Sequence, residues 1–301
     1  MGDLVKYIKA KTIVSGYVES NSWFGVNYNM NIYKGCPHGC IYCDSRSECY
    51  NIDNFDKVRA KENAIDIITK DLKSKKKKGV VMTGSMSDPY NPFEKELYLT
   101  RKALEQINLY NFGVAIATKS SLITRDIDVI KKISEHSPVL IKITITTFDD
   151  TLCRKIEPNV SVSSERFKAI KELSDNGIYT GILLMPILPF INDNEENIIN
   201  IVKKAYECGA KFIYSFGFGV TLRGNQREYY YKKLTEVFKN EKLVGKYIDT
   251  FGSRYEYRTP NAEKLYKVFK IECEKYGILY KMEDIISNYK ENYNQTQMSL
   301  F

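Results

Sequence analysis

The feature that most constrains the fold is a regular alternation of strand-like and helix-like segments after residue 30. Apolar runs of strand length occur at residues 31–33, 80–82, 113–117, 139–146, 182–185 and 211–216. Between them apolar side chains recur at helical spacing, as at Ile127, Ile130 and Ile133. Strands that alternate with helices pair in parallel through right-handed crossovers. Six such units are too few to close a TIM barrel, so the pattern predicts an α/β fold with an open, partial (β/α)6 barrel.

Polar residues follow one strand after another at the carboxyl ends, where barrel enzymes place their active sites. They are Ser85, Ser87 and Asp88 after the second strand, Thr118 and Lys119 after the third, and Thr144, Thr146 and Thr147 after the fourth, with Met185-Pro186 closing the fifth. Any one of them can be a capping or turn residue. Their repetition along one rim favours a functional site at that rim.

Three cysteines lie close together in one loop, at Cys36, Cys40 and Cys43. Three thiolates can hold a 4Fe–4S cluster by three of its irons and leave the fourth iron open. A four-ligand zinc site that adds Cys49 or His38 is an alternative. Zinc ligands more often come as two separated pairs, and the sequence has no second Cys-x-x-Cys. Disulfides fit poorly, because seven cysteines is an odd number and the chain shows no apolar signal segment.

Composition favours a reduced, cytoplasmic protein that does not enter the membrane. No apolar run approaches the roughly 18 residues of a membrane span. The formal net charge of +8 permits a polyanionic partner without requiring one.

The cysteine spacing, with Tyr42 before the last cysteine, resembles the signature of the radical SAM enzymes. The resemblance implies that the open iron binds the amine and carboxylate of S-adenosylmethionine. An electron, from a donor such as flavodoxin or ferredoxin, then cleaves this cofactor to a 5′-deoxyadenosyl radical, which abstracts hydrogen from a substrate. The predicted partial barrel is the fold that these enzymes share.

A closer resemblance, to the spore photoproduct lyase-like branch of that superfamily, rests on residues 31–43, 87–94, 117–120, 124–128 and 156–158. By this likeness Ser87 and Asp88 approach the amino group of S-adenosylmethionine, and Lys119 approaches its carboxylate or ribose. Thr146 approaches the ribose and Tyr42 the adenine. Ser85 and Thr144 are further cofactor-binding candidates. Arg166 is a weaker candidate for the carboxylate, with a solvated helix arginine as the alternative.

The sequence departs from the true spore lyase at two positions. Met86 stands where the lyase has a hydrogen-donating cysteine, and Asp44 stands where it has a tyrosine. A thioether has no S–H hydrogen to give, so cleavage of spore photoproduct is not expected. Cys49 and Cys153 fall in loops of the predicted rim and are candidate substitute donors. The alternative, which is favoured, is that both are inert small residues.

Residues 221 to 301 are predicted to be mostly helical and to form a C-terminal cap. Basic residues alternate with tyrosines at 227–233 and 253–258, a pattern that can hold a single-stranded nucleic acid. Packing of these tyrosines in amphipathic helices is the favoured alternative. The predicted division of the chain is an N-terminal extension at 1–28, the barrel at 29–220, the cap at 221–289 and a flexible tail at 290–301.

The tail ends in Gln297, Met298, Ser299, Leu300 and Phe301. This peptide resembles the one by which bacterial proteins dock on the DNA sliding clamp, with the apolar side chains filling a groove and the glutamine forming hydrogen bonds. A terminal apolar pair that folds back on the protein is the alternative. Docking on the clamp would place the enzyme at DNA.

The leading hypothesis is therefore a radical SAM enzyme, lyase-like or transferase, that repairs or modifies a nucleic acid. One alternative is radical modification of a peptide or small metabolite. The other is a zinc-stabilised nucleic-acid-binding module, which the metal content of the protein would distinguish.

Overall fold

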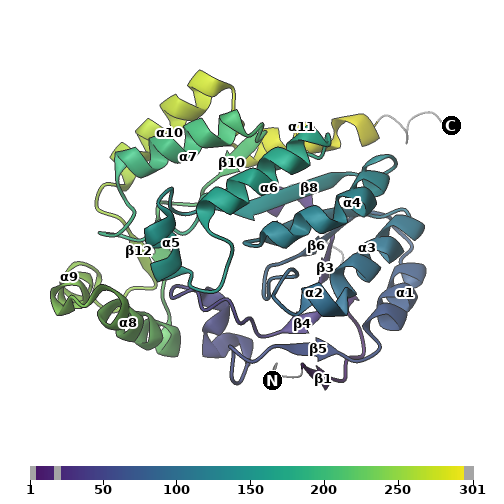
Figure 1. The fold of residues 1–301 in the computed structure, drawn as a ribbon, viewed down its shortest axis with the longest axis horizontal. Coiled ribbons are helices and arrows are strands. Elements are labelled where there is room, and N and C mark those ends of the chain that lie inside the picture. The colour runs from purple at the N-terminus through teal and green to yellow at the C-terminus, as the bar shows by residue number, and fades with distance from the viewer. Residues whose placement is uncertain (1–4, 17–21, 295–301) are drawn as a thin grey trace.

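The computed structural model of the chain describes residues 5–16 and 22–294 (Figure 1). Its largest sheet has seven strands in the order β10-β9-β8-β7-β6-β3-β2. The edge strand β2 (Val14–Ser15) is antiparallel to its neighbour. The other six are parallel: β3 (Tyr28–Met30), β6 (Val80–Thr83), β7 (Gly113–Thr118), β8 (Val139–Thr144), β9 (Thr180–Leu183) and β10 (Phe212–Tyr214). These six strands and their intervening helices confirm the predicted partial (β/α)6 barrel.

The connecting helices pack on the outer face of this sheet (Figure 1). They are α1 (Ala64–Ser74), α2 (Glu94–Leu97), α3 (Leu99–Leu109), α4 (Ile127–Ser134), α6 (Ser163–Asp175) and α7 (Glu195–Glu207). Helix α5 (Asp150–Ile156) instead packs against the cysteine loop through Ile156. Val114 and Ile116 of β7 share one buried core with Leu104 of α3 and Ile130 of α4. Ala115, between them on the strand, belongs to a different core inside the barrel. The two-residue period of the strand thus separates helix-facing from interior side chains.

The amino-terminal half of the barrel interior is filled with apolar side chains. Phe24, in the short 3₁₀ helix η1 (Trp23–Gly25), packs there with Val80, Leu140 and Phe212, which lie at or near the beginnings of their strands. Helix α11 (Met282–Asn294) covers the same end, and its Tyr289 hydroxyl donates to the Phe24 carbonyl oxygen at 2.6 Å. Segments from near the two ends of the described chain therefore close the bottom of the barrel, opposite the carboxyl ends of the strands.

The first barrel strand differs from the prediction. The sequence predicts it at residues 31–33, whereas β3 ends at Met30. Residues Tyr33–Lys34 form β4, which pairs with β5 (Arg59–Lys61) in a separate three-stranded sheet completed by β1 (Lys6–Ile8). Tyr28, Met30 and Ile32 are all buried, so the apolar alternation runs on past the point where the chain leaves the barrel.

The C-terminal segment is mostly helical, as predicted, with one two-stranded ribbon. Strands β11 (Gly219–Thr221) and β12 (Glu256–Arg258) pair antiparallel, and α8 (Gly224–Phe238) and α9 (Glu241–Phe251) lie between them in sequence. Helix α10 (Ala262–Tyr276) packs against α7 of the barrel. In Figure 1 the pair α8 and α9 lies at one end of the molecule, beside the N-terminal third of the chain.

The cap tyrosines support the packing interpretation. Tyr230, Tyr247 and Tyr257 are buried in one core, and Tyr257 stacks on Phe251 with ring centroids 4.6 Å apart. These three rings are unavailable to stack on nucleic-acid bases. The predicted clamp-binding residues 297–301 lie outside the described residues. Within the described part of the chain, no helix combines the length and apolar character needed to cross a membrane.

Candidate active site

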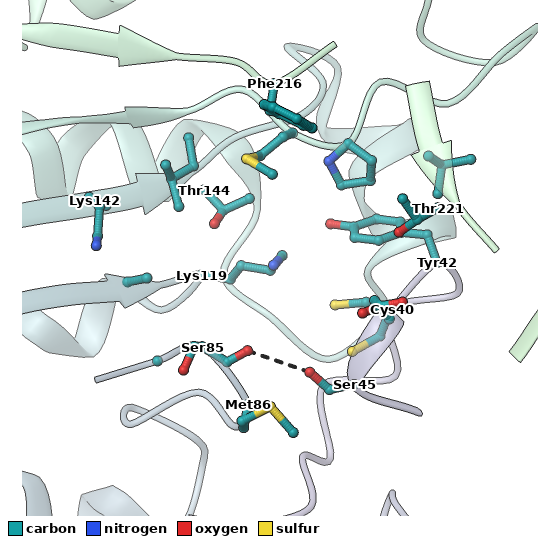
Figure 2. A pocket seen from close by; sticks show the side chains of 18 of the residues that line it. Cys40, Tyr42, Ser45, Ser85, Met86, Lys119, Lys142, Thr144, Phe216 and Thr221 are labelled. Carbon is teal, nitrogen blue, oxygen red and sulfur yellow. Dashed lines mark hydrogen bonds between the residues drawn. The ribbon is translucent and has the colours of Figure 1, made fainter. Parts of the chain in front are cut away.

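A cavity of about 400 Å³ opens at the carboxyl ends of the barrel strands. Its walls come from the cysteine loop, from the segments that follow β6 to β9, and from the β11–β12 ribbon of the cap (Figure 2). Most of the predicted site residues line it together: Cys36, Cys40, Tyr42, Cys43, Ser85, Ser87, Asp88, Lys119 and Thr144. The rim predicted from the strand ends is therefore the wall of one cavity.

The cysteine loop is fixed to its surroundings by backbone hydrogen bonds. The amide of Cys36 donates to the Phe55 carbonyl oxygen at 2.8 Å, and the amide of Ile41 donates to the Ile156 carbonyl oxygen at 3.0 Å. Gly35 has a φ of +82°, and a Cβ there would lie 2.6 Å from the Phe55 carbonyl oxygen. The sharp turn into the first cysteine therefore requires glycine.

The cysteine thiols are buried against the cavity wall. Cys36 and Cys40 are only 9% and 7% exposed. Burial raises the pKa of Cys36 to about 12, and it also raises the pKa of Cys40 and of Cys43, although the Lys119 ammonium opposes this for the last two. Such thiols stay protonated unless a metal centre replaces their protons, as happens when thiolates bind iron or zinc.

The arrangement of the ligands distinguishes between metals. A zinc ion needs all its sulfur ligands about 2.3 Å from a single point. Among the described residues, no three His, Cys, Asp or Glu side chains converge in a way that would hold one ion. Cys49, the predicted fourth zinc ligand, is exposed in the 3₁₀ helix η3 (Glu48–Tyr50) and does not line the cavity. Three separated thiols on one wall fit a cluster that binds each of them through a different iron.

The Ser87-Asp88 pair joins the loop after β6 to both of its neighbours. The Ser87 hydroxyl donates to the Gly35 carbonyl oxygen at 2.5 Å. The Asp88 carboxylate accepts from the Thr118 hydroxyl at 2.6 Å and from the Lys119 amide at 2.8 Å, and His38 Nδ1 lies 3.5 Å from it. One carboxylate therefore fixes the cysteine loop, the β6 loop and the end of β7 relative to one another.

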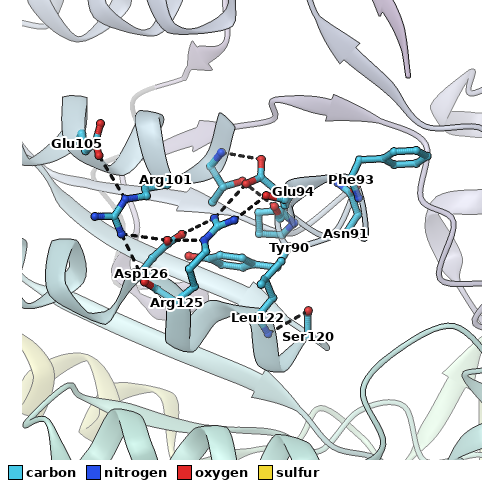
Figure 3. A network of polar contacts seen from close by, with 12 residues as sticks. Tyr90, Asn91, Phe93, Glu94, Arg101, Glu105, Ser120, Leu122, Arg125 and Asp126 are labelled. Atoms are coloured by element: carbon cyan, nitrogen blue, oxygen red, sulfur yellow. Dashed lines mark hydrogen bonds and ion pairs between the residues drawn. The ribbon is translucent and has the colours of Figure 1, made fainter. Parts of the chain in front are cut away.

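A buried ion network supports this rim from behind (Figure 3). Arg125 donates to the Glu94 carbonyl oxygen at 2.6 Å and lies 2.8 Å from the Asp126 carboxylate. The Glu94 carboxylate also accepts from the Tyr33 hydroxyl and, at 2.7 Å, from the Thr100 amide. Because Glu94 and Asp126 are fully buried, these contacts hold the segments after β6 and β7 in place.

A second buried network lies behind Tyr42. Its hydroxyl donates to Glu157, whose other carboxylate oxygen is 2.5 Å from Arg166. Burial raises the pKa of the Tyr42 hydroxyl well above its ordinary value. Burial also disfavours the charged Glu157, but Arg166, Lys119 and the Tyr42 hydrogen bond outweigh it, so its pKa is lowered. The Lys119 ammonium lies 5.7 Å from the centre of the Tyr42 ring.

Five predicted residues of the described part lie away from the cavity. Thr147 is buried, and its hydroxyl accepts from the Asp149 amide at 3.3 Å, as a turn residue does. Arg166 and Thr146 are both fully buried behind its wall, so the solvated alternative for Arg166 is wrong. Cys153 belongs to α5 instead of a rim loop, and its sulfur lies 3.5 Å from Arg166. The exposed Cys49 sulfur lies 3.5 Å from Arg223 of the cap. Met86, in contrast, lines the cavity.

Some cavity residues were missed by the sequence reasoning. Thr221, Glu256 and Arg258 line it from the cap ribbon, and Lys142 lines it from the middle of β8. The ribbon offers no motif in the sequence. Lys142 did offer a signal, since it is the one charged residue within the apolar run Val139–Thr144.

Comparisons with known proteins agree with this geometry. Residues 30–205 match the Radical SAM superfamily. An uncharacterized protein of Methanocaldococcus jannaschii is 37% identical over 174 residues, which are 57% of this chain and 64% of that protein. This chain therefore matches less than two thirds of that relative's length. An uncharacterized protein of Acidianus two-tailed virus is 27% identical over 248 residues, 76% of this chain and 80% of that protein.

Among solved structures, spore photoproduct lyase complexed with dinucleoside spore photoproduct is similar, with a TM-score of 0.66. The similarity covers 92% of this chain and 81% of that chain at 14% identity, so it concerns the fold. The family match alone spans more than half of the 301 residues. The chain belongs to the radical SAM superfamily, and its partial barrel is the fold of spore photoproduct lyase.

Proposed function

We propose that Cys36, Cys40 and Cys43 of this radical SAM enzyme hold a 4Fe–4S cluster, and that the enzyme repairs or modifies a nucleic acid. The observation that carries the proposal is the set of three thiols that line one cavity, while no three His, Cys, Asp or Glu side chains among the described residues form a group that could hold a single ion. When bound, the cluster and S-adenosylmethionine supply reductive cleavage of the cofactor to a 5′-deoxyadenosyl radical.

Different residues of the rim are proposed to bind different parts of S-adenosylmethionine. Ser87 and Asp88 border the cavity beside the cysteine loop and are proposed to bind its amino group. Burial disfavours the charged form of Lys119, but Glu157 and Cys40, once it is a thiolate as a cluster ligand would be, outweigh it and keep the Lys119 pKa raised. Lys119 therefore brings a positive charge for the carboxylate. Thr144 lines the cavity where Thr146 does not, so we assign the ribose contact to Thr144. Tyr42 is proposed to contact the adenine.

The cavity does not suit the spore photoproduct reaction. Among the described residues that line it, the only thiols are the three proposed cluster ligands. Cys153 and Cys49, the candidate substitute donors, lie away from the cavity wall. Met86 occupies the position of the lyase donor and has no S–H hydrogen. The substrate radical is therefore not quenched by a thiol at this position, and it either takes a hydrogen back from 5′-deoxyadenosine or reacts in another way. A lyase-like or transferase reaction on another lesion or base fits these residues.

A nucleic-acid substrate is supported by three observations. The cap ribbon brings the exposed Arg258 to the cavity, where it can meet a phosphate. The solved structure of the same fold holds a dinucleoside. The sequence of residues 297–301 resembles a clamp-binding peptide, which would bring the enzyme to DNA.

The test is anaerobic reconstitution of the full chain, followed by dithionite and S-adenosylmethionine. We expect about four irons and four sulfides per chain and formation of 5′-deoxyadenosine. Single-stranded DNA should increase that yield several-fold. Stoichiometric zinc without iron would contradict the cluster and leave the zinc-stabilised binding module. A yield that DNA leaves unchanged, but a peptide or metabolite extract raises, would contradict the nucleic-acid substrate only.

A further inference from the structure

Lys142 is a buried lysine inside the barrel that the assigned site does not use. It lies on β8 two residues before Thr144, so both side chains project from the same face of the strand. Lys142 is 1% exposed and lines the cavity that Lys119 and Thr144 border (Figure 2). At strand spacing it lies about 6.6 Å below Thr144. Its amine therefore belongs to the floor of the cavity, beneath the rim.

The neighbours of this side chain in the sheet are small or apolar, and the Phe212 ring covers Gly181. Its partners on the neighbouring strands are Ala117 and Gly181, two of the smallest residues. Met82 and Leu183 are the cavity-lining residues of β6 and β9. A leucine or methionine at position 142 would fill such surroundings at no electrostatic disadvantage. An amine here is thus unexplained by packing.

The amine lacks a polar partner. None of the described residues forms a hydrogen bond or an ion pair with it. Its Nζ lies over the Phe24 ring, 4.5 Å from the ring centre. An aromatic face compensates weakly for lost hydration. Nζ is not among the fully enclosed side-chain atoms without a partner, so it borders the cavity and is open to a ligand there. Holding an amine in a largely buried position without a hydrogen-bond partner from the protein is unfavourable.

The surroundings supply no charge either. Burial alone lowers the pKa of Lys142 to about 7. The groups that face it from β6, β7, β9 and η1 are Met82, Ala117, Gly181, Leu183 and Phe24, and the same interior core holds Tyr179 and Tyr214. Burial raises the pKa of both tyrosine hydroxyls, so they stay neutral and bring no charge. An anion entering this space would stabilise the protonated amine, so the site is suited to a ligand that carries its own negative charge.

We propose that Lys142 is a substrate-binding residue that holds an oxyanion of the substrate at the floor of the cavity. The inference rests on the proposed function in assigning the rim above it to S-adenosylmethionine. On a nucleic-acid substrate the oxyanion is a backbone phosphate, and on a peptide or metabolite it is a carboxylate. Both present the same chemistry to the amine, a desolvated negative oxygen.

The test is calorimetric titration of the full chain, reconstituted anaerobically and saturated with S-adenosylmethionine. The phosphate probe is thymidylyl-thymidine, and its neutral control is the methylphosphonate analogue. The carboxylate probe is an acetylated dipeptide, and its neutral control is the amide. Wild type is compared with Lys142→Met, which keeps an unbranched side chain of similar length without the amine. It is also compared with Lys168→Met, which removes an exposed lysine from α6.

We expect one charged probe to bind wild type and Lys168→Met at least tenfold more tightly than its neutral analogue. Lys142→Met should lose that difference while binding S-adenosylmethionine within twofold of wild type. Binding to wild type should take up protons and weaken from pH 6 to pH 8, because the bound anion recharges the amine. Neither probe has a group that titrates in this range, so Lys142→Met should show no such dependence.

The outcomes separate the two proposals. Preference for the dipeptide over the dinucleotide, lost in Lys142→Met, supports the oxyanion site and contradicts the nucleic-acid substrate. Charged and neutral probes that bind wild type equally, or a Lys142→Met variant that keeps the preference, overturn the role of Lys142. Loss of S-adenosylmethionine binding in Lys142→Met also overturns it, because the amine would then belong to the cofactor site.

Discussion

Two buried basic residues, Arg166 and Lys142, lie on opposite sides of one cavity wall and differ in whether the protein supplies partners for their side chains. Arg166 is fully buried behind the wall, and each of its donor groups has a partner. It donates to the Thr144 carbonyl oxygen at 2.8 Å and to the Ser161 carbonyl oxygen at 2.6 Å, and it pairs with Glu157. Lys142 faces the cavity from inside the barrel, and the described residues offer it only the Phe24 ring.

The difference separates structural from functional burial. A buried ion pair whose remaining hydrogen bonds are satisfied needs nothing further, and it fixes the elements that it joins. A buried amine without a partner destabilises the fold and persists where a ligand completes it. Side chains behind the wall should therefore matter to stability, and side chains that face the cavity should matter to binding. The predictions below test that division.

The largest effect is expected at the cysteines that face the cavity. Replacing Cys36, Cys40 or Cys43 by Ala should remove essentially all bound iron, because a cluster held by two thiolates is not retained. The fold should survive, since the loop is held by backbone hydrogen bonds. Iron analysis and circular dichroism of anaerobic preparations measure the two effects.

Cys153 and Cys49 provide matched controls for that experiment. Cys153 lies behind the wall beside Arg166, and Cys49 is exposed beside Arg223. Their Ala variants should keep full iron and full 5′-deoxyadenosine formation. Loss of iron from the Cys49 variant would support a site with four cysteine ligands. It would contradict the rule that only cavity-facing side chains contribute to binding.

The next largest effect concerns the ion pair behind the wall. Glu157→Gln or Arg166→Met leaves one buried charge uncompensated, which costs about 3–5 kcal/mol of unfolding free energy. For a chain of this length that lowers the melting temperature by roughly 5–8 °C. The pKa of Glu157 is lowered in the fold, so its contribution is present above the unfolded pKa and is lost as the pH falls through the folded one.

The double variant sharpens this prediction. If the two residues act as a pair, Glu157→Gln with Arg166→Met should lose less stability than the sum of the single variants. Urea unfolding of the apoprotein measures all four states. Single variants that each change the unfolding free energy by under about 1 kcal/mol would show that Arg166 is not held as the contacts indicate.

Replacing Lys142 should act in the opposite direction. A pKa lowered from 10.5 to about 7 means that the unfolded chain binds more protons between those values, so wild-type stability rises with pH across that window. Below pH 7 the amine is charged in both states, and the full cost of burying it lowers the stability of the wild type. Lys142→Met should therefore be more stable than wild type at neutral pH, by about 2–4 kcal/mol.

The pH dependence identifies the cause. The advantage of Lys142→Met over wild type should shrink as the pH rises from 7 to 10 and vanish only above the unfolded pKa of 10.5, where the wild-type amine is neutral in both states. Urea unfolding at pH 6, 8 and 10 measures it. A Lys142→Met variant that is less stable than wild type at every pH would mean that the amine has a structural partner.

Sequence reasoning located the elements that depend on local pattern. Five of the six barrel strands, the cysteine loop and the polar residues after β6 and β7 follow from periodicity, spacing and chain order, and they meet at one cavity. The exception is β3, which ends at Met30, before the predicted residues 31–33. Sequence reasoning failed where the answer depends on which way a side chain points in the folded structure. Thr144 and Thr146 cannot be distinguished without knowing where β8 ends, and Thr144 is its last residue.

The same limit explains Arg166 and Cys153. Both lie on helices at positions that the sequence describes as ordinary, and their burial arises because α5 and α6 fold back over the loop that carries Tyr42. Lys142 was overlooked for the opposite reason. A lysine in an apolar strand was not weighed as a signal, although its two-residue spacing from Thr144 puts both on the cavity face.

The smallest effect is expected where the cysteine loop meets the cap. Asp44, directly after the last cysteine, lies 3.0 Å from Arg223, and their side chains are 31% and 36% exposed. Such pairs are worth about 0.2–1 kcal/mol and weaken in salt. Asp44→Asn or Arg223→Gln should therefore leave the melting temperature within about 2 °C of wild type.

The effect should appear locally instead, since Arg223 also donates to the Tyr255 hydroxyl at 2.7 Å and lies directly before α8. We expect hydrogen exchange in α8 to quicken two- to fivefold in low salt and to match wild type in 1 M salt. Lys233→Gln is the control, because its ion pair is with Glu236 within the same helix. Equal exchange in Arg223→Gln and Lys233→Gln would show that the cap is held by its buried tyrosines alone. A large global loss of stability in either variant would show that the exposed Asp44–Arg223 pair contributes to the stability of the whole fold, as the buried ion pair does.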